Sequence, residues 1–224
     1  DTLPPLHIVP LYCDLDDRAP YLTMKKDLSI RFPTAHVVAA NAGVVTGKLK
    51  QMSSGWVYET NKRPNPDKPG KFIVEQTPIL FSSHKYAALD DLLEENQHDN
   101  TLVFYWYQEE LAELQRRYPK ARLLTDPGAI DDWNAGKIEL LLAHPKSAGH
   151  GLNLQHGGCK CVFFTLPYYS QELFEQAYGR LHRGGQKHAV WVYVLLTRKT
   201  VDEMEWASLG NKAAISDIAK DALR

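Results

Sequence analysis

The stretch IELLLAHPKSAGHGLNLQHGGCKCVFFTL, residues 138–166, places two short apolar runs on either side of a loop of small and polar residues. Each run is continuous rather than alternating, which is typical of a strand buried on both faces of a sheet. Glycines in the loop allow a backbone to approach a ligand and present its N–H groups to it. The stretch predicts two parallel strands joined by either a phosphate-binding loop or a tight turn that needs positive φ.

The same pattern continues on both sides of this stretch. Apolar runs at 102–104 and 189–196 flank it, and segments with helical character alternate with all four runs. This alternation predicts an α/β fold, a parallel sheet with helices on both faces. The expected strands are 101–106, 121–124, 138–143, 161–166 and 189–197, and the expected helices are 83–96, 109–118, 127–134, 171–183 and 201–223.

Residues 1–80 have a different pattern. We expect an extended lead-in to residue 13, and then helices over about 14–32 and 36–52. WVYET and FIVEQTPI, on either side of a proline-rich loop at 61–71, predict a β-hairpin. The sequence thus predicts a helical and hairpin segment, 1–80, packed on an α/β domain, 81–224.

Composition limits the class of protein. The 224 residues suffice for one large or two small domains, and a net charge of −1 confines any nucleic-acid surface to a local patch. Three cysteines suit a reducing compartment, and neither a signal peptide nor an apolar run long enough to span a membrane is found. We expect a cytoplasmic protein, and we expect Asp1, which is not Met, to be a cut point in a longer chain.

The segment QAYGRLHRGGQ, residues 176–186, carries cationic side chains at regular spacing. Gln176, Arg180 and Arg183 are spaced i, i+4 and i+7, so a helix over 171–183 would place all three on one stripe. Two guanidiniums and an amide form a row of donors suited to phosphate oxygens. The same spacing also fits a solvated basic helix face.

Other constellations are weaker. Gly43–Leu49, GVVTGKL, contains a Gly-Lys pair but not the spacing or the Ser/Thr of a phosphate loop. Cys159 and Cys161 lie near several histidines without a recognised zinc spacing, so we predict no metal site and no Cys–His nucleophile. Tyr105, Trp106 and Tyr107 could stack on bases, although packing is the commoner role of aromatic residues at a strand end.

Together these motifs resemble the C-terminal RecA-like lobe of superfamily-two helicases, specifically the Swi/Snf-like ATP-driven DNA translocases. QAYGRLHRGGQ resembles the last helicase motif, Gln-x-x-x-Arg-x-x-Arg-x-Gly-Gln, and SAGHGLNLQ resembles the motif before it. TLVFYWYQEELAEL, SSHKYAALDDLLEEN, IDDWNAGKIELLLA and TVDEMEWASLGNK fit in order and spacing. GKLKQMSSGWVYET looks like the segment that precedes the lobe in bacterial and phage members.

The resemblance implies roles for particular residues. Arg180 and Arg183 would be arginine fingers that reach the γ-phosphate of ATP, and Gln176, Gly151 and Asn153 would line the nucleotide site. Ser147, Gly149 and His150 would contact DNA. ATP and Mg²⁺ would be held mainly by an N-terminal lobe with Walker motifs, which is expected to be a partner together with double-stranded DNA.

Some residues depart from the family pattern. His150 stands where a small residue such as Thr is common, and Gly184 replaces the usual Ile before Gly-Gln. LLTDPGAIDDW is short and lacks the arginine that many members carry. Two alternatives stay open: a motor lobe of a restriction- or modification-associated helicase, and a stand-alone nucleic-acid-binding module without ATPase function.

Overall fold

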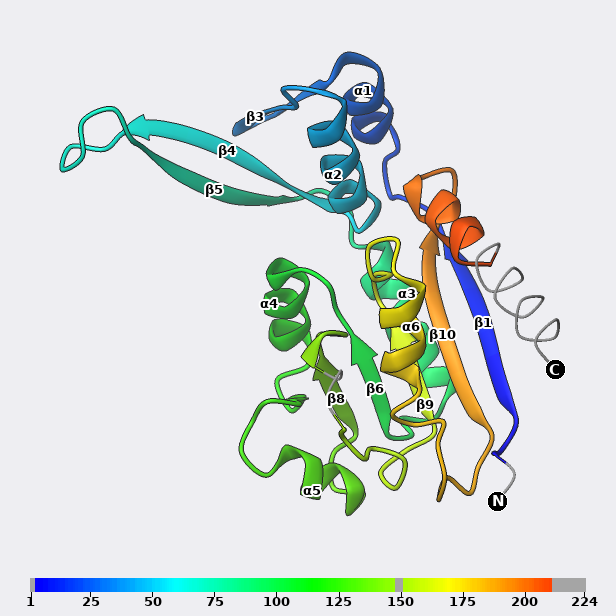
Figure 1. The fold of residues 1–224 in the computed structure, drawn as a ribbon. Coiled ribbons are helices and arrows are strands. Elements are labelled where there is room, and N and C mark those ends of the chain that lie inside the picture. The colour runs from blue at the N-terminus through cyan, green and yellow to red at the C-terminus, as the bar shows by residue number, and fades with distance from the viewer. Residues whose placement is uncertain (1–2, 148–150, 211–224) are drawn as a thin grey trace, which may run out of the picture. The chain divides into compact units, whose positions relative to one another are not determined.

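The computed structural model of the protein describes residues 3–147 and 151–210. Contacts divide the chain into two compact units, coloured along the chain in Figure 1. The first unit contains residues up to Cys13, the segment Lys85–Leu196 and residues from Glu203 onward. The second unit contains Asp14–His84 and Thr197–Asp202.

The first unit is built on a six-stranded sheet with the order β1-β10-β9-β6-β8-β7. From β10 across to β7, each strand pairs with its neighbour in parallel. The strands are β1 (Leu6–Cys13), β6 (Thr101–Phe104), β7 (Arg122–Leu123), β8 (Leu140–Ala143), β9 (Lys160–Phe163) and β10 (Val190–Thr197). The helices are α3 (His84–Glu95), α4 (Gln108–Arg117), α5 (Ala129–Asn134) and α6 (Gln171–Tyr178), with a further helix over 201–210.

Alternation along the central strand explains why helices cover both faces of the sheet. Leu102 and Phe104 of β6 pack in one apolar cluster with side chains of α5 and α6. Val103, between them, packs in the other cluster with side chains of α3 and α4. Successive side chains of a strand point to opposite faces, so a continuous apolar run requires cover on both. The predicted parallel sheet with helices on both faces is confirmed.

Strand β1 was not predicted as part of this sheet. Pro5 O accepts a hydrogen bond from Val190 N, and the Cys13 thiol donates to Leu196 O at the other end of β10. The two strands therefore run in the same direction. The lead-in was correctly predicted as extended, but its sheet partner lies more than 180 residues away in the sequence, so local pattern could not reveal it.

The second unit contains two short helices and two hairpins. Its helices are α1 (Ala19–Asp27) and α2 (Ala42–Ser53), and its hairpins join β2 (Ser29–Phe32) to β3 (Ala35–Val38) and β4 (Trp56–Pro64) to β5 (Phe72–Leu80). Buried Tyr21, Met24, Val37 and Met52 form its apolar core. The predicted hairpin of WVYET with FIVEQTPI is confirmed in β4 and β5.

Both helices expected before residue 53 are shorter than predicted. The first ends at Asp27, because Leu28 adopts a left-handed conformation with φ 56° and caps it. Ser29–Phe32 then pairs with Ala35–Val38 across a two-residue turn, where helical residues were predicted. The second helix begins only at Ala42, after the Asn41 side chain accepts a hydrogen bond from Val44 N.

A buried polar cluster closes the second unit. The imidazole of His84 lies 2.8 Å from Ser82 Oγ through Nδ1, and 2.8 Å from Thr197 Oγ1 through Nε2. Ser53 Oγ donates to the Asp202 carboxylate at 2.7 Å, and Thr197 Oγ1 donates to Ser53 O. These bonds join segments that are distant in the sequence, so residues 197–202 belong to this unit although Thr197 is the last residue of β10.

Candidate functional site

The helix that was expected to carry the arginines ends before it reaches them. Helix α6 begins after Ser170, whose side chain accepts a hydrogen bond from Leu173 N, and ends at Tyr178. Beyond it the chain tightens into i→i−3 bonds, from Arg180 N to Ala177 O and from Leu181 N to Tyr178 O. The prediction of one helical stripe through all three residues is therefore wrong. Leu181 is fully buried in the core, which is consistent with this tighter turn.

The two arginines nevertheless lie together, beside the glycine-containing loop. Arg183 Nη1 donates to Leu152 O at 3.1 Å, and Leu154 N donates to Arg180 O at 3.3 Å. Burial, and then the nearby charge of Arg183, lowers the pKa of Arg180 from its ordinary value. Two like charges held close together favour an anionic ligand between them, because such a ligand would relieve their repulsion.

Gln176 occupies a different environment. Its side chain is exposed and donates to Glu172 Oε1 at 2.8 Å, one turn earlier in α6. The structure thus places Gln176 on the surface of the helix, while Arg180 and Arg183 lie beyond its C-terminal end.

The loop opposite the arginines is held through its main chain. Gly151 has a φ of +62°, and Asn153 is exposed, with its carbonyl accepting from Asn134 Nδ2 at 2.8 Å. The next carbonyl, of Leu154, accepts from Trp133 Nε1 at 2.8 Å. Helix α5 therefore supports one side of this loop and the arginine segment supports the other. Positive φ at Gly151 is what a tight turn requires, and it also leaves the backbone open to a ligand.

Gln186 connects the segment that contains Arg180 and Arg183 to the loop 151–158, a role that the sequence did not predict. Its Nε2 donates to the carbonyls of Gln155 and Gly158, each at 3.0 Å. Its Oε1 accepts from Lys187 N at 2.9 Å and from His188 N at 3.0 Å. The motif containing Gln186 was identified from the sequence, but only the fold shows that its amide bridges two loops.

Two glycines and a tryptophan set the path of the loop toward β9. A Cβ at Gly157 would lie 2.2 Å from Trp133 O, and one at Gly158 would lie 2.8 Å from Asn100 O. Neither position therefore accepts a side chain without a shift of the backbone. The adjacent glycines directly before an apolar strand were the available sequence signal for this close approach.

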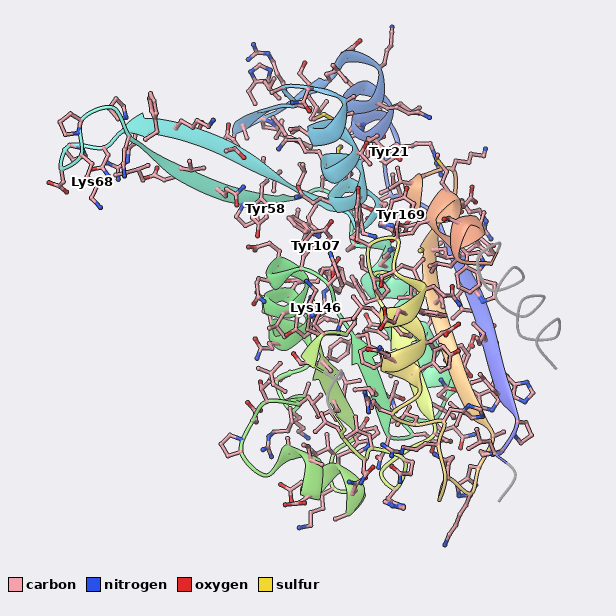
Figure 2. All side chains as sticks on the ribbon, in the orientation of Figure 1. Tyr21, Tyr58, Lys68, Tyr107, Lys146 and Tyr169 are labelled. Carbon is pink, nitrogen blue, oxygen red and sulfur yellow. The ribbon has the colours of Figure 1, made fainter. Side chains whose placement is uncertain are left out.

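The other end of the loop lies at the carboxyl edge of the sheet. Ser147 is exposed, and its N–H donates to His144 O at 2.9 Å. The His144 ring stacks on Trp106 at 4.9 Å between centroids, and Lys146 Nζ lies 5.7 Å from the centroid of the same ring. Burial lowers the pKa of His144. Figure 2 shows Lys146 and Tyr107 beyond the ends of neighbouring strands β8 and β6. Gly149 and His150 lie outside the described residues.

The aromatic residues after β6 are engaged within the protein. Tyr105 is buried and meets the His144 ring edge-on, with centroids 5.7 Å apart. Trp106 is covered by His144 and Lys146. These contacts support the packing role rather than base stacking.

The loops after β6, β8 and β9 leave one edge of the sheet because their strands are parallel, but the arginines do not lie there. A helix that connects two parallel strands runs back against their direction, so α6 carries the chain away from this edge (Figure 1). Eight residues of helix extend about 12 Å. Ser147 and the arginines therefore lie toward opposite ends of the sheet.

Metal and thiol chemistry find no support in the part of the chain that the structure describes. No three His, Cys, Asp or Glu side chains come together there as a metal site would require. Burial raises the pKa of both Cys159 and Cys161, which keeps the thiols protonated.

Gly43–Leu49 lies inside α2, so it does not form a phosphate loop. No described helix is long and apolar enough to cross a membrane.

Comparison with known proteins shows what this arrangement is similar to. Residues 84–185 match the model of the helicase conserved C-terminal domain. Over these residues the chain is similar to a helicase C-terminal domain. They contain the loop 151–158 and both arginines.

The chain has relatives among phage proteins and chromatin-remodeling ATPases. The chain is 32% identical over 212 residues to putative protein p41 of Acyrthosiphon pisum secondary endosymbiont phage 1. It is 28% identical over 160 residues to the chromatin-remodeling ATPase INO80 of Lodderomyces elongisporus. These matches cover 92% and 65% of this chain but only 43% and 9% of the relatives, so the chain spans less than half of each.

A solved structure has the same fold. The C-terminal part of the Fun30 ATPase domain aligns with a TM-score of 0.56 and 16% identity, covering 93% of this chain and 90% of that one. The RecA-like fold and the similarity to Swi/Snf-type ATPases, both predicted from the sequence, are confirmed.

Proposed function

We propose that this chain is the C-terminal half of the motor of an ATP-dependent DNA translocase. In this proposal Arg180 and Arg183 contact the phosphates of an ATP molecule that a separate N-terminal lobe binds together with Mg²⁺. The observation that carries the proposal is that the arginine segment is bonded to the main chain of the loop, through the Arg183 guanidinium to Leu152 O and through Arg180 O to Leu154 N, with the two arginine charges close enough to influence each other. ATP hydrolysis develops charge on the transferred phosphoryl group, and positioned arginines stabilise that charge.

The loop 151–158 supplies the link between nucleotide and DNA in this proposal. Gly151 and Asn153 would lie at the nucleotide, beside the arginines. Ser147, with Gly149 and His150, would contact the phosphates of double-stranded DNA at the carboxyl edge of the sheet. Gln176, exposed on α6, would meet the N-terminal lobe. Because one loop connects both ends, a shift at the nucleotide would reach the DNA contacts.

The similarity to a phage protein and to ATPases supports a proposal about where the whole protein acts. We propose that the whole protein acts in the cytoplasm of a bacterial or phage-infected cell. The part of the chain that the structure describes contains cations suited to phosphate but no phosphate loop, so we propose that the chain alone does not hydrolyse ATP. DNA-stimulated turnover by the purified chain would contradict this part.

The test of the arginine role uses the chain joined to its N-terminal lobe. Arg180→Ala should lower the rate of DNA-stimulated ATP hydrolysis by about 10³- to 10⁵-fold, the range found for arginine fingers. ATP binding, measured with a fluorescent analogue, should stay largely intact because the other lobe holds the nucleotide. Arg116→Ala is the matched control, since Arg116 is exposed and, among the residues that the structure describes, bonds only to Glu113. Wild-type turnover in the Arg180 variant would refute the proposed role.

A further inference from the structure

The β4–β5 hairpin is a long ribbon with little cover. Its strands pair over nine residues each, from Trp56 opposite Leu80 to Pro64 opposite Phe72. At about 3.3 Å per residue the ribbon extends about 30 Å. From Thr60 onward its residues are exposed, apart from half-buried Asn65, Ile73 and Ile79. A two-stranded ribbon is only marginally stable in water, so such a length is better explained by a surface that binds a partner.

The register divides the ribbon into two chemically different faces. One face, called here the open face, carries side chains that are cationic, amide, hydroxyl or apolar: Thr60, Lys62, Pro64, Phe72, Val74 and Gln76. Phe72 is 63% exposed and Val74 is 54% exposed. The opposite face carries the carboxylates, and there Glu75 accepts from Arg63 Nε at 2.7 Å. The open face therefore contains no group that would repel a phosphate.

The tip of the ribbon adds charge on a defined turn. Residues 65–71 contain Lys68 and Lys71 against the single carboxylate of Asp67. Asn65 N donates to Lys71 O at 2.9 Å, and Asp67 N donates to Asn65 Oδ1 at 2.9 Å. These bonds fix the backbone of the turn, so the ends of the two lysine side chains start from defined positions of the chain. Figure 2 shows Lys68 at this tip, at the opposite end of the ribbon from Tyr58.

We infer that the β4–β5 ribbon is a DNA-binding arm that lies in a groove of duplex DNA and contacts its phosphates through Lys62, Lys68 and Lys71. A two-stranded β-ribbon fits the major groove of B-form DNA, which is about 12 Å wide. The deep, narrow major groove of an RNA duplex does not admit it. The uncharged side chains of the open face would meet the base edges, and the lysines would meet the backbone.

A protein strand is a poorer partner for this ribbon. Pro64 in β4 and Pro78 in β5 remove backbone donors that strand addition would use. The lysines at the tip also oppose edge-to-edge association. The inference rests on the proposed function only for the choice of DNA as partner, and it involves neither ATP nor the arginines.

The experiment measures DNA binding by the 224-residue chain without nucleotide. Fluorescence anisotropy with a labelled DNA duplex would be recorded over about 50 to 200 mM salt. In the variant Lys62→Gln/Lys68→Gln/Lys71→Gln the plot of log affinity against log salt should flatten by about 0.9 for each phosphate that is no longer neutralised, so by about 2 to 3 overall. Because the three side chains are exposed, the melting temperature should not change.

A control with the same change in charge separates the arm from general electrostatics. Lys25→Gln/Lys26→Gln/Lys199→Gln removes three other exposed lysines of the same unit and should leave the salt slope unchanged. Equal flattening in both variants, or no measurable DNA binding by the wild type, would overturn the inference. So would equal arm-dependent affinity for duplex RNA, or arm-dependent binding to anionic vesicles in place of DNA. The arm variant leaves Arg180, Arg183 and Ser147 unchanged, so equal flattening in both variants would overturn the arm without affecting the proposed function, whereas loss of ATP hydrolysis in the Arg180 variant tests the proposed function alone.

Discussion

The arginine segment, residues 180–186, and the β4–β5 arm both present cations, but they hold them differently. The arginines are half-buried, and the backbone around them is tied to the loop 151–158 through Gln186, Arg183 and Leu154. The lysines of the arm are exposed, Lys62 in strand β4 and Lys68 and Lys71 on the turn at the end of the ribbon. Charge held in one geometry suits a single phosphoryl group in a transition state. Exposed charge on an extended ribbon suits the repeating phosphates of DNA.

The largest effect on folding should come from the close packing under the arginine segment. Gly157→Ala places a Cβ 2.2 Å from Trp133 O, so the backbone must shift, and we expect a loss of about 3 kcal/mol or more in unfolding free energy. Urea denaturation measures it. Gly47→Ala in α2 is the control, because no atom lies within 4 Å of the added Cβ, and it should stabilise by about 0.5 to 1 kcal/mol. If Gly157→Ala left the unfolding free energy unchanged, the packing of the loop against Trp133 would not be as tight as the structure indicates.

The next effect separates geometry from charge. In the two-lobed protein, Arg180→Lys keeps the positive charge but removes the planar guanidinium, and hydrolysis should fall about 100-fold, because small misplacements at a reacting group cost about that much. In the arm, Lys68→Arg with Lys71→Arg should leave DNA affinity within about twofold, since either side chain can contact phosphate. Equal tolerance at both places would break the distinction between them.

A smaller effect should separate two glutamines of the same motif. Gln186→Ala leaves the carbonyls of Gln155 and Gly158 and the N–H groups of Lys187 and His188 without their amide partner. We expect a loss of about 1 to 3 kcal/mol. Gln176→Ala removes only one exposed bond to Glu172 and should change stability by about 0.5 kcal/mol or less. Thermal melting of both variants gives the comparison, and similar values would mean that Gln186 does not support the segment.

Much of the first unit could be predicted because its signals are local. Continuous apolar runs such as Leu140–Ala143 specify strands buried on both faces, and the last helicase motif lies within eleven residues. The second unit was predicted less well. Ser29–Phe32 pairs with Ala35–Val38, and short mixed segments of this kind do not differ enough in periodicity from a helix.

The sequence by itself determined the alternation of strands and helices, the resemblance to helicase C-terminal domains, and the motif that contains Arg180 and Arg183. Those properties depend on residue type and on spacing over a few turns of chain. Only the tertiary structure decided that α6 ends at Tyr178 and that Arg180 and Arg183 lie against Leu152 and Leu154 rather than on a helix face. The reason is physical: burial of Leu181 and hydrogen bonds to a loop about thirty residues away in the sequence accompany the turn, and the i, i+4, i+7 spacing contains neither.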